Sequence, residues 1–208
     1  INFYNHYINH QILYVTGSTG AGKSTQIPKL LLYATKMYDY KSKGKVITTQ
    51  PRIPPTENNT TWIAMGMGVP INKKINNKYN ITTDNYNLQF KHSQKQHTRE
   101  NHLGLLFKTV TDGTLYQELL NNPIMKEQIP NNKLTIEGKM DFIYGINNKY
   151  DVMIIDESHE HNTNMDLILT LARYACFHNN SLRLVITSAT MEDDEPIYRS
   201  YFKLINDN

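Results

Sequence analysis

The segment Gly17–Ser24 (GSTGAGKS) constrains the fold of this chain more than any other part of the sequence. It matches the pattern G-x-x-x-x-G-K-[ST], which joins a strand to a helix and cradles phosphates. An apolar run, Ile12–Thr16, precedes it, and a helical pattern over Lys23–Tyr38 follows it. Glycines let several backbone N–H groups point at one phosphate chain, and the helix amino terminus adds a favourable partial charge. The alternative is a structural glycine-rich turn with an exposed lysine.

Strand-like and helix-like segments alternate along most of the chain. Further strands are predicted at Lys45–Gln50, Leu105–Val110, Val152–Ile155 and Leu182–Thr187. Further helices are predicted at Thr56–Met67, after the strand Leu105–Val110 through Leu120, and at Asp166–Phe177. This alternation predicts an α/β fold with a mostly parallel central sheet and helices on both faces. The strands are continuously apolar, which agrees with burial on both sides.

Residues 72–87 and 121–149 fit this scheme poorly, and the first of these segments is rich in Asn and Lys with little periodicity. The helical pattern Thr56–Met67 is weakly amphipathic and carries the single tryptophan, Trp62. We expect Trp62 to lie in the core, with a base-stacking platform as the alternative. Residues 121–149 contain three Asn pairs together with Pro123, Pro130 and Gly138, which predicts an insertion.

The size of the chain predicts one domain covering residues 1–208, since 208 residues suffice for a single large core. No apolar run approaches the roughly 18 residues that a membrane span needs, so we expect no membrane association. The chain begins at Ile1 without a signal segment, and its one cysteine, Cys176, fits a reducing compartment. We therefore expect a piece of a longer intracellular polypeptide that is not secreted.

The charge of the chain is only mildly positive, at +3. Its distribution is uneven, because residues 71–102 hold six Lys and Arg against Asp84 and Glu100. A solvated basic surface and a surface facing nucleic-acid phosphates are both compatible with this segment.

A second motif follows the short apolar strand Val152–Ile155. Asp156, Glu157, Ser158 and His159 stand where the carboxyl end of that strand should reach the phosphate loop. Two adjacent carboxylates repel each other, and a bound cation relieves that repulsion. We expect Asp156 to hold Mg²⁺ through water and Glu157 to activate the attacking water. In the phosphate loop, Lys23 is expected to reach the β- and γ-phosphates of ATP, and the Ser24 hydroxyl to ligate Mg²⁺.

A third motif, Ser188-Ala189-Thr190, follows the last predicted strand. Two further segments, Thr49-Gln50-Pro51-Arg52 and Thr111-Asp112-Gly113, lie between the phosphate loop and the acidic motif. The five motifs occur in the order found in superfamily 2 helicases. The chain resembles the DEAH/DExH group of that family from Ile12 to about Phe202. The resemblance implies a RecA-like P-loop domain, the first of two, in which an arginine-bearing second RecA-like domain closes over the nucleotide. It also implies an ATP-dependent RNA helicase that needs ATP and Mg²⁺.

The resemblance assigns roles to individual residues. It implies catalytic roles for Lys23, Asp156, Glu157 and His159, of which Asp156 and Glu157 join Ser24 at Mg²⁺. It implies nucleotide contacts for Gly17, Ser18, Thr19, Gly20, Ala21, Gly22, Lys23, Ser24 and Thr25. It implies nucleic-acid contacts for Pro51, Arg52, Thr111, Asp112 and Gly113, and a coupling role for Ser188, Ala189 and Thr190. The expected partners are single-stranded or duplex RNA, with DNA possible, and the second RecA-like domain.

Some positions depart from the cellular DEAH pattern. Ile53 follows Pro51-Arg52 where a second arginine is usual, and His161 ends a motif that usually ends in arginine. These residues are similar to the poxviral nucleoside triphosphate phosphohydrolase II group and predict a viral protein of the host cytoplasm or virion. The isolated chain is expected to be monomeric and nearly inactive, since a missing arginine finger costs about 10³–10⁵ in rate. A P-loop kinase and a non-catalytic RNA-binding scaffold are the alternative functions.

Overall fold

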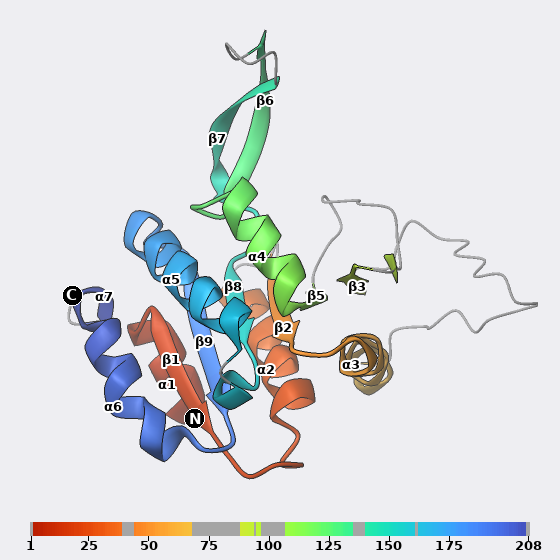
Figure 1. Ribbon diagram of the computed structural model, residues 1–208, viewed down its shortest axis with the longest axis vertical. Coiled ribbons are helices and arrows are strands. Elements are labelled where there is room, and N and C mark those ends of the chain that lie inside the picture. The colour runs from red at the N-terminus through yellow and green to blue at the C-terminus, as the bar shows by residue number, and fades with distance from the viewer. Residues whose placement is uncertain are drawn as a thin grey trace, which may run out of the picture.

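The central sheet of the domain is mostly parallel. The computed structural model describes residues 2–38, 44–67, 88–93, 95–96, 107–134, 140–160 and 162–206. The strands of the sheet are β1 (Ile12–Thr16), β2 (Val46–Gln50), β3 (Leu88–His92), β4 (Lys95–Gln96), β5 (Phe107–Thr111), β8 (Val152–Ile155) and β9 (Arg183–Ser188). They lie in the order β1-β9-β8-β2-β5-β3-β4, and only the short pair β3 and β4 is antiparallel (Figure 1).

Helices cover both faces of this sheet. The first group is α1 (Asn2–Asn9), α2 (Lys23–Tyr38) and α3 (Ile53–Gly66), and the second is α4 (Asp112–Asn121), α5 (Thr163–His178), α6 (Met191–Tyr201) and α7 (Lys203–Asn206). Side chains of successive strand residues point to opposite faces of the sheet. Val46 and Val152 pack with the first group of helices, and Ile47 and Met153 pack with the second. Two apolar cores result, which confirms the predicted α/β class with helices on both sides.

The expectation that Trp62 lies in the core is wrong. Its side chain is 62% exposed, whereas α3 meets the sheet through Thr56, Thr60, Ile63 and Ala64. These four residues follow the spacing of one helical stripe, and Trp62 lies beside that stripe.

The segment for which we predicted an insertion folds as a separate β-hairpin. Its strands, β6 (Lys126–Leu134) and β7 (Met140–Asn148), pair only with each other and form a two-stranded antiparallel sheet. Figure 1 shows this hairpin projecting from the body, beyond the end of α4.

Most of the basic segment 71–102 and residue His161 lie outside the described residues. None of the helices within the described part of the chain is long and apolar enough to cross a membrane.

Candidate active site

The motifs singled out from the sequence gather at the carboxyl ends of the parallel strands. The loop Gly17–Ser24 follows β1, Asp156 follows β8, and Ser188 ends β9. Pro51 and Thr111 stand at the corresponding ends of β2 and β5. The topology therefore places all five motifs at one end of the sheet. Open α/β sheets bind their ligands at this end, outside the carboxyl ends of the strands.

The loop Gly17–Ser24 is shaped as a cradle for an anion. Gly20 and Gly22 have φ angles of 83° and 79°, which side-chain-bearing residues rarely adopt. The Lys23 ammonium is held over the loop by the carbonyl oxygens of Gly17 and Ser18, the latter at 3.0 Å. Among the described residues, the N–H groups of Gly22, Lys23 and Ser24 donate to no backbone carbonyl. Free N–H groups at the start of a helix are suited to phosphate oxygens.

The carboxylate of Asp156 is buried and fixed by the two neighbouring strands. One oxygen accepts a hydrogen bond from Thr187 on β9, and the other accepts one from Gln50 on β2. The sequence reading missed Thr187, although its signal was available: it is a polar residue near the end of an otherwise apolar strand, one position before Ser188. The two donors leave Asp156 a single orientation at the end of β8.

Glu157 lies beside Asp156 and partly faces solvent. Its φ of 56° turns the chain sharply out of β8. Burial and the charge of Asp156 raise the pKa of Glu157, while His159 and Lys23 act in the opposite direction. The positive charge of Lys23 therefore favours the ionised form of this carboxylate. A carboxylate with a raised pKa next to a phosphate site is suited to accept a proton.

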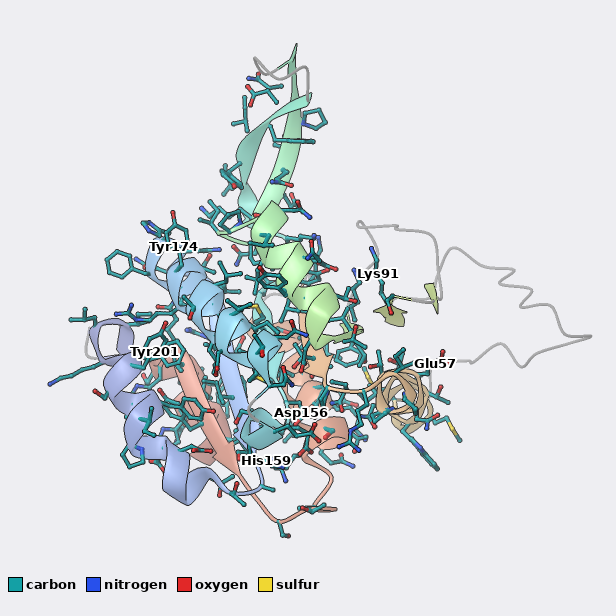
Figure 2. All side chains as sticks on the ribbon, viewed as in Figure 1. Glu57, Lys91, Asp156, His159, Tyr174 and Tyr201 are labelled. Carbon is teal, nitrogen blue, oxygen red and sulfur yellow. The ribbon has the colours of Figure 1, made fainter. Side chains whose placement is uncertain are left out.

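His159 connects the acidic motif to the segment Ser188–Thr190. Its Nε2 lies 3.3 Å from Oε2 of Glu157, and its Nδ1 lies 3.4 Å from the Ser188 hydroxyl. The Ala189 N–H donates to Nδ1 at 3.4 Å, so the proton of a neutral ring is on Nε2 and faces Glu157. Figure 2 labels Asp156 and His159 at this end of the sheet.

Arg52 is the most accessible of the residues expected at nucleic acid. Its side chain is 73% exposed and lies 3.3 Å from the carboxylate of Glu160. Pro51, Thr111 and Gly113 are half-buried, and the Thr111 hydroxyl lies 2.9 Å from that of Thr114. An exposed ion pair contributes little stability, so the Arg52 guanidinium can exchange Glu160 for another anion.

Asp112 is buried rather than at the surface. Its Oδ2 accepts a hydrogen bond from Asn162 at 3.1 Å, and the nearby Thr49 side chain favours its charged form. Thr49 also accepts the Asp156 N–H at 3.2 Å. Burial raises the pKa of Asp112. Thr49 therefore lies near both the segment Thr111–Gly113 and the acidic motif, a proximity that the sequence pattern did not show.

The described residues contain no group of three or more His, Cys, Asp and Glu side chains that could hold a metal ion by themselves. Ser24, Asp156 and Glu157 fit a different arrangement, in which Mg²⁺ takes one or two protein ligands and fills the rest of its shell with phosphate oxygens and water. The N–H groups beside Ser24 that donate to no backbone carbonyl are suited to the phosphate oxygens of such an arrangement.

No protein-family model matches the chain. Over an alignment of 214 positions that covers the whole chain, it is 49% identical to a protein of Acanthamoeba polyphaga mimivirus that bears the name ATP-dependent RNA helicase R366. It is 28% identical over 93% of its length to the ATP-dependent RNA helicase HrpA of Borreliella burgdorferi, and 28% identical over 90% to a Saccharomyces cerevisiae protein with the name ATP-dependent RNA helicase DHR2. The chain spans only 12%, 18% and 20% of these relatives.

Proposed function

The chain belongs to the DEAH/DExH group of superfamily 2 helicases, and from this premise we propose that it is the first motor domain of an ATP-dependent RNA helicase. In this proposal it binds Mg–ATP and single-stranded nucleic acid, and it works inside a cell or virion when joined to a second RecA-like domain. The observation that supports it most is the connection through His159, which links the carboxylate of Glu157 to Ser188 and Ala189.

The nucleotide is proposed to bind along the loop Gly17–Thr25. Backbone N–H groups of Gly22, Lys23 and Ser24 would receive phosphate oxygens. Lys23 would exchange the carbonyls of Gly17 and Ser18 for the β- and γ-phosphates, because a charged acceptor binds an ammonium more strongly than a neutral one. The side chain therefore has to move only from the loop to the ligand that the loop encloses.

The hydrolytic step is proposed to depend on three side chains. Ser24 and, through water, Asp156 would hold Mg²⁺ with Glu157 nearby, and the ion would neutralise phosphate charge. Glu157 would accept the proton of the attacking water, for which its raised pKa suits it. Asp156 is held by Gln50 and Thr187, so its own orientation does not change as Glu157 gains a proton.

The nucleic acid is proposed to run over the ends of β2 and β5. Arg52 would leave Glu160 for a phosphate, and backbone groups around Pro51, Thr111 and Gly113 would hold the sugar-phosphate chain. Asp112 would act from the interior, because its buried carboxylate lies near Thr49, whose hydroxyl accepts the Asp156 N–H. The preference for RNA rests on the names of the relatives.

The proposal is tested on the chain joined to its second RecA-like domain. Phosphate release is followed while single-stranded RNA is added. We expect RNA to stimulate release, with a stimulation that weakens as salt rises. Lys23→Ala should abolish it, and Lys29→Ala, a change in the same helix away from the loop, should not. A kinase would transfer phosphate to a small acceptor and ignore RNA, and a scaffold would bind RNA without turnover. Either result would refute the helicase assignment.

A further inference from the structure

The outer edge of β1 is unpaired within the described part of the chain. β1 lies at one end of the strand order, and β9 pairs with its inner edge. The carbonyl of Gln11, directly before β1, accepts an N–H from β9 at 2.9 Å. Backbone groups alternate in direction along a strand, so those of Leu13 and Val15 also face β9, whereas those of Tyr14 and Thr16 face outward. Tyr14 and Thr16 therefore offer N–H and C=O groups to a further strand.

A groove of about 250 Å³ runs along this edge. Its floor is formed by consecutive residues of β1, Ile12–Val15. One wall is α1, through Phe3, His6 and His10, and the other wall is α6, through Arg199. α1 and α6 pack in the two different apolar cores, so they cover opposite faces of the sheet. The groove therefore lies in the plane of the sheet, where an extended segment can add to it.

The direction that the chain takes after β9 favours this edge. From β8 through α5 to β9, the chain moves one position towards β1. α6 follows β9 and packs in the same apolar core as α5, on the same face of the sheet. Connections between parallel strands are right-handed in about 98% of cases, so two consecutive connections on one face move in one direction across the sheet. Since β1 already occupies the position beside β9, a strand after α6 falls beyond β1.

α6 also returns the chain to the end of the sheet where a parallel strand begins. It starts at Met191, after β9 has ended at the carboxyl side of the sheet. Its 11 residues span about 16 Å, close to the length of the five-residue β1. α6 therefore carries the chain back along β1 towards the amino end of the sheet, where α7 follows (Figure 1).

We propose that the outer edge of β1 binds a parallel strand, formed by the polypeptide that continues from α7 in the longer protein. This strand rests on the proposed function, in which the chain is joined to a second RecA-like domain. The chain spans at most 20% of the three relatives named above, which leaves ample polypeptide for it. Tyr14 and Thr16 each donate to the added strand and accept from it. β1 then becomes an interior strand.

The walls of the groove define the chemistry of the added strand. Both of its faces are covered, by α1 and by α6, so it should be a continuous apolar run of about five residues. Side chains that face α1 meet the rings of Phe3 and His6. Side chains that face α6 meet Tyr14, whose ring lies 5.3 Å from the Arg199 guanidinium. The first such run after α7 is the expected strand.

The added strand affects the phosphate loop, because β1 leads directly into that loop. Thr16 ends β1, and Gly17 begins the loop. Elements held by few buried contacts open more easily than interior ones. A strand on each side of β1 therefore holds the start of the loop more firmly than β9 alone. The connection to the second domain is then itself hydrogen-bonded to the strand that carries the loop.

Amide hydrogen exchange of the longer protein, resolved to single residues, tests the proposal. All N–H groups from Leu13 to Thr16 should exchange slowly, because each has a strand partner. In the 208-residue chain the rates should alternate, slow at Leu13 and Val15 and fast at Tyr14 and Thr16. After correction for intrinsic rates, the Tyr14 rate divided by the Leu13 rate should be at least about tenfold lower in the longer protein.

A proline variant identifies the segment that covers the edge. Prolines at two adjacent central positions of the first apolar run after α7 remove an N–H that faces β1. In the longer protein, this change should return Tyr14 and Thr16 to fast exchange and leave Leu13 slow. The comparison between the variant and the unmodified longer protein does not depend on the folding of the shorter chain.

Three results would each overturn the proposal. Alternating rates in the longer protein would show that the edge stays open. Slow exchange that persists in the proline variant would show that another segment covers it. Slow exchange of Tyr14 in the 208-residue chain that increases with protein concentration would show that a second copy covers it.

Phosphate release, measured on the same longer protein, separates this proposal from the proposed function. If RNA stimulates release while Tyr14 exchanges quickly, only the added strand is refuted. If Tyr14 exchanges slowly and RNA does not stimulate release, only the helicase function is refuted.

Discussion

The two ends of the central sheet both contain buried polar groups, but they use them differently. At the carboxyl end, Lys23 and Glu157 stay partly accessible, and one oxygen of the buried Asp112 has no partner among the described residues. At the amino end, below the hairpin, the charged groups pair with one another. The carboxyl end is therefore suited to receive ligands, whereas the amino end holds the hairpin of β6 and β7 in place.

The network at the amino end centres on Glu118. This α4 carboxylate lies 2.7 Å from the Lys108 ammonium and accepts a hydrogen bond from the Tyr150 hydroxyl at 2.7 Å. Lys149, at 3.1 Å, completes the cluster. Burial alone would raise the pKa of Glu118, but Lys108 and Lys149 lower it to about 2. Burial lowers the pKa of Lys108, which Glu118 opposes. Lys108 and Lys149 both pair with Glu118, so the charged groups of this cluster are not available to a ligand.

The largest expected effect lies at the carboxyl end. Glu157→Gln removes the proposed proton acceptor while keeping the size of the side chain, and we expect RNA-stimulated phosphate release to fall about 10²–10⁴-fold. Because burial and Asp156 raise the pKa of Glu157, the acidic limb of the wild-type rate profile should lie above pH 4.5, the ordinary value for glutamate. The melting temperature should change little. A variant with wild-type turnover would remove Glu157 from the mechanism.

The matched change at the amino end should act on stability instead. Glu118→Gln leaves the Lys108 ammonium buried without its carboxylate, which costs about 3–5 kcal/mol of unfolding free energy. Urea denaturation measures the loss. Folded protein should still bind nucleotide with wild-type affinity, because Glu118 lies in the other network. If nucleotide affinity fell and stability did not, the division between the two ends would be wrong.

The same carboxylate predicts a pH dependence. The pKa of Glu118 is about 2 in the folded chain and about 4.5 when unfolded, so the unfolded chain binds its proton first as the pH falls. The contribution of Glu118 should be complete above about pH 4.5 and should disappear as the pH falls towards 2. In Glu118→Gln, this part of the stability profile should be flatter. Equal slopes in the two proteins would contradict the low folded pKa.

A smaller effect is expected at the connection between the motifs. His159→Ala removes the ring that joins Glu157 to Ser188 and Ala189. We expect the stimulation by RNA to fall about tenfold, the usual size of a coupling between two sites, while nucleotide binding without RNA stays unchanged. Equal losses with and without RNA would indicate a role in binding or chemistry rather than coupling.

The smallest effect is expected for Trp62→Ala. The residue is exposed, so the unfolding free energy should change by no more than about 0.5 kcal/mol. Ile63→Ala, one residue along the same helix and fully buried, should cost about 2–5 kcal/mol. Similar losses for the two variants would place Trp62 in the core after all.

The sequence predicted the strands of the sheet better than the polar contacts at its two ends. Strands such as Ile12–Thr16 and Val152–Ile155 are found at the predicted residues, because continuous apolar runs between turn residues leave few alternatives. The motif residues could be placed at one edge because parallel strands must end together. Thr187 and Glu118 were missed, and Thr49 was named only as part of a motif, since the contacts of all three depend on neighbours distant in sequence. The hairpin was predicted only as an insertion, because Asn-rich strands with bulges have no clear period.

The position of β1 has a consequence for synthesis. Its only partner among the described strands is β9, near the opposite end of the chain, while the loop that follows β1 holds the phosphate cradle. A ribosome therefore releases the cradle early and the strand that supports it late. Until β9 emerges, β1 presents two unpaired edges, and pairing across so much intervening chain is slow. A nascent chain should gain nucleotide binding only after β9 has emerged and the other strands have assembled.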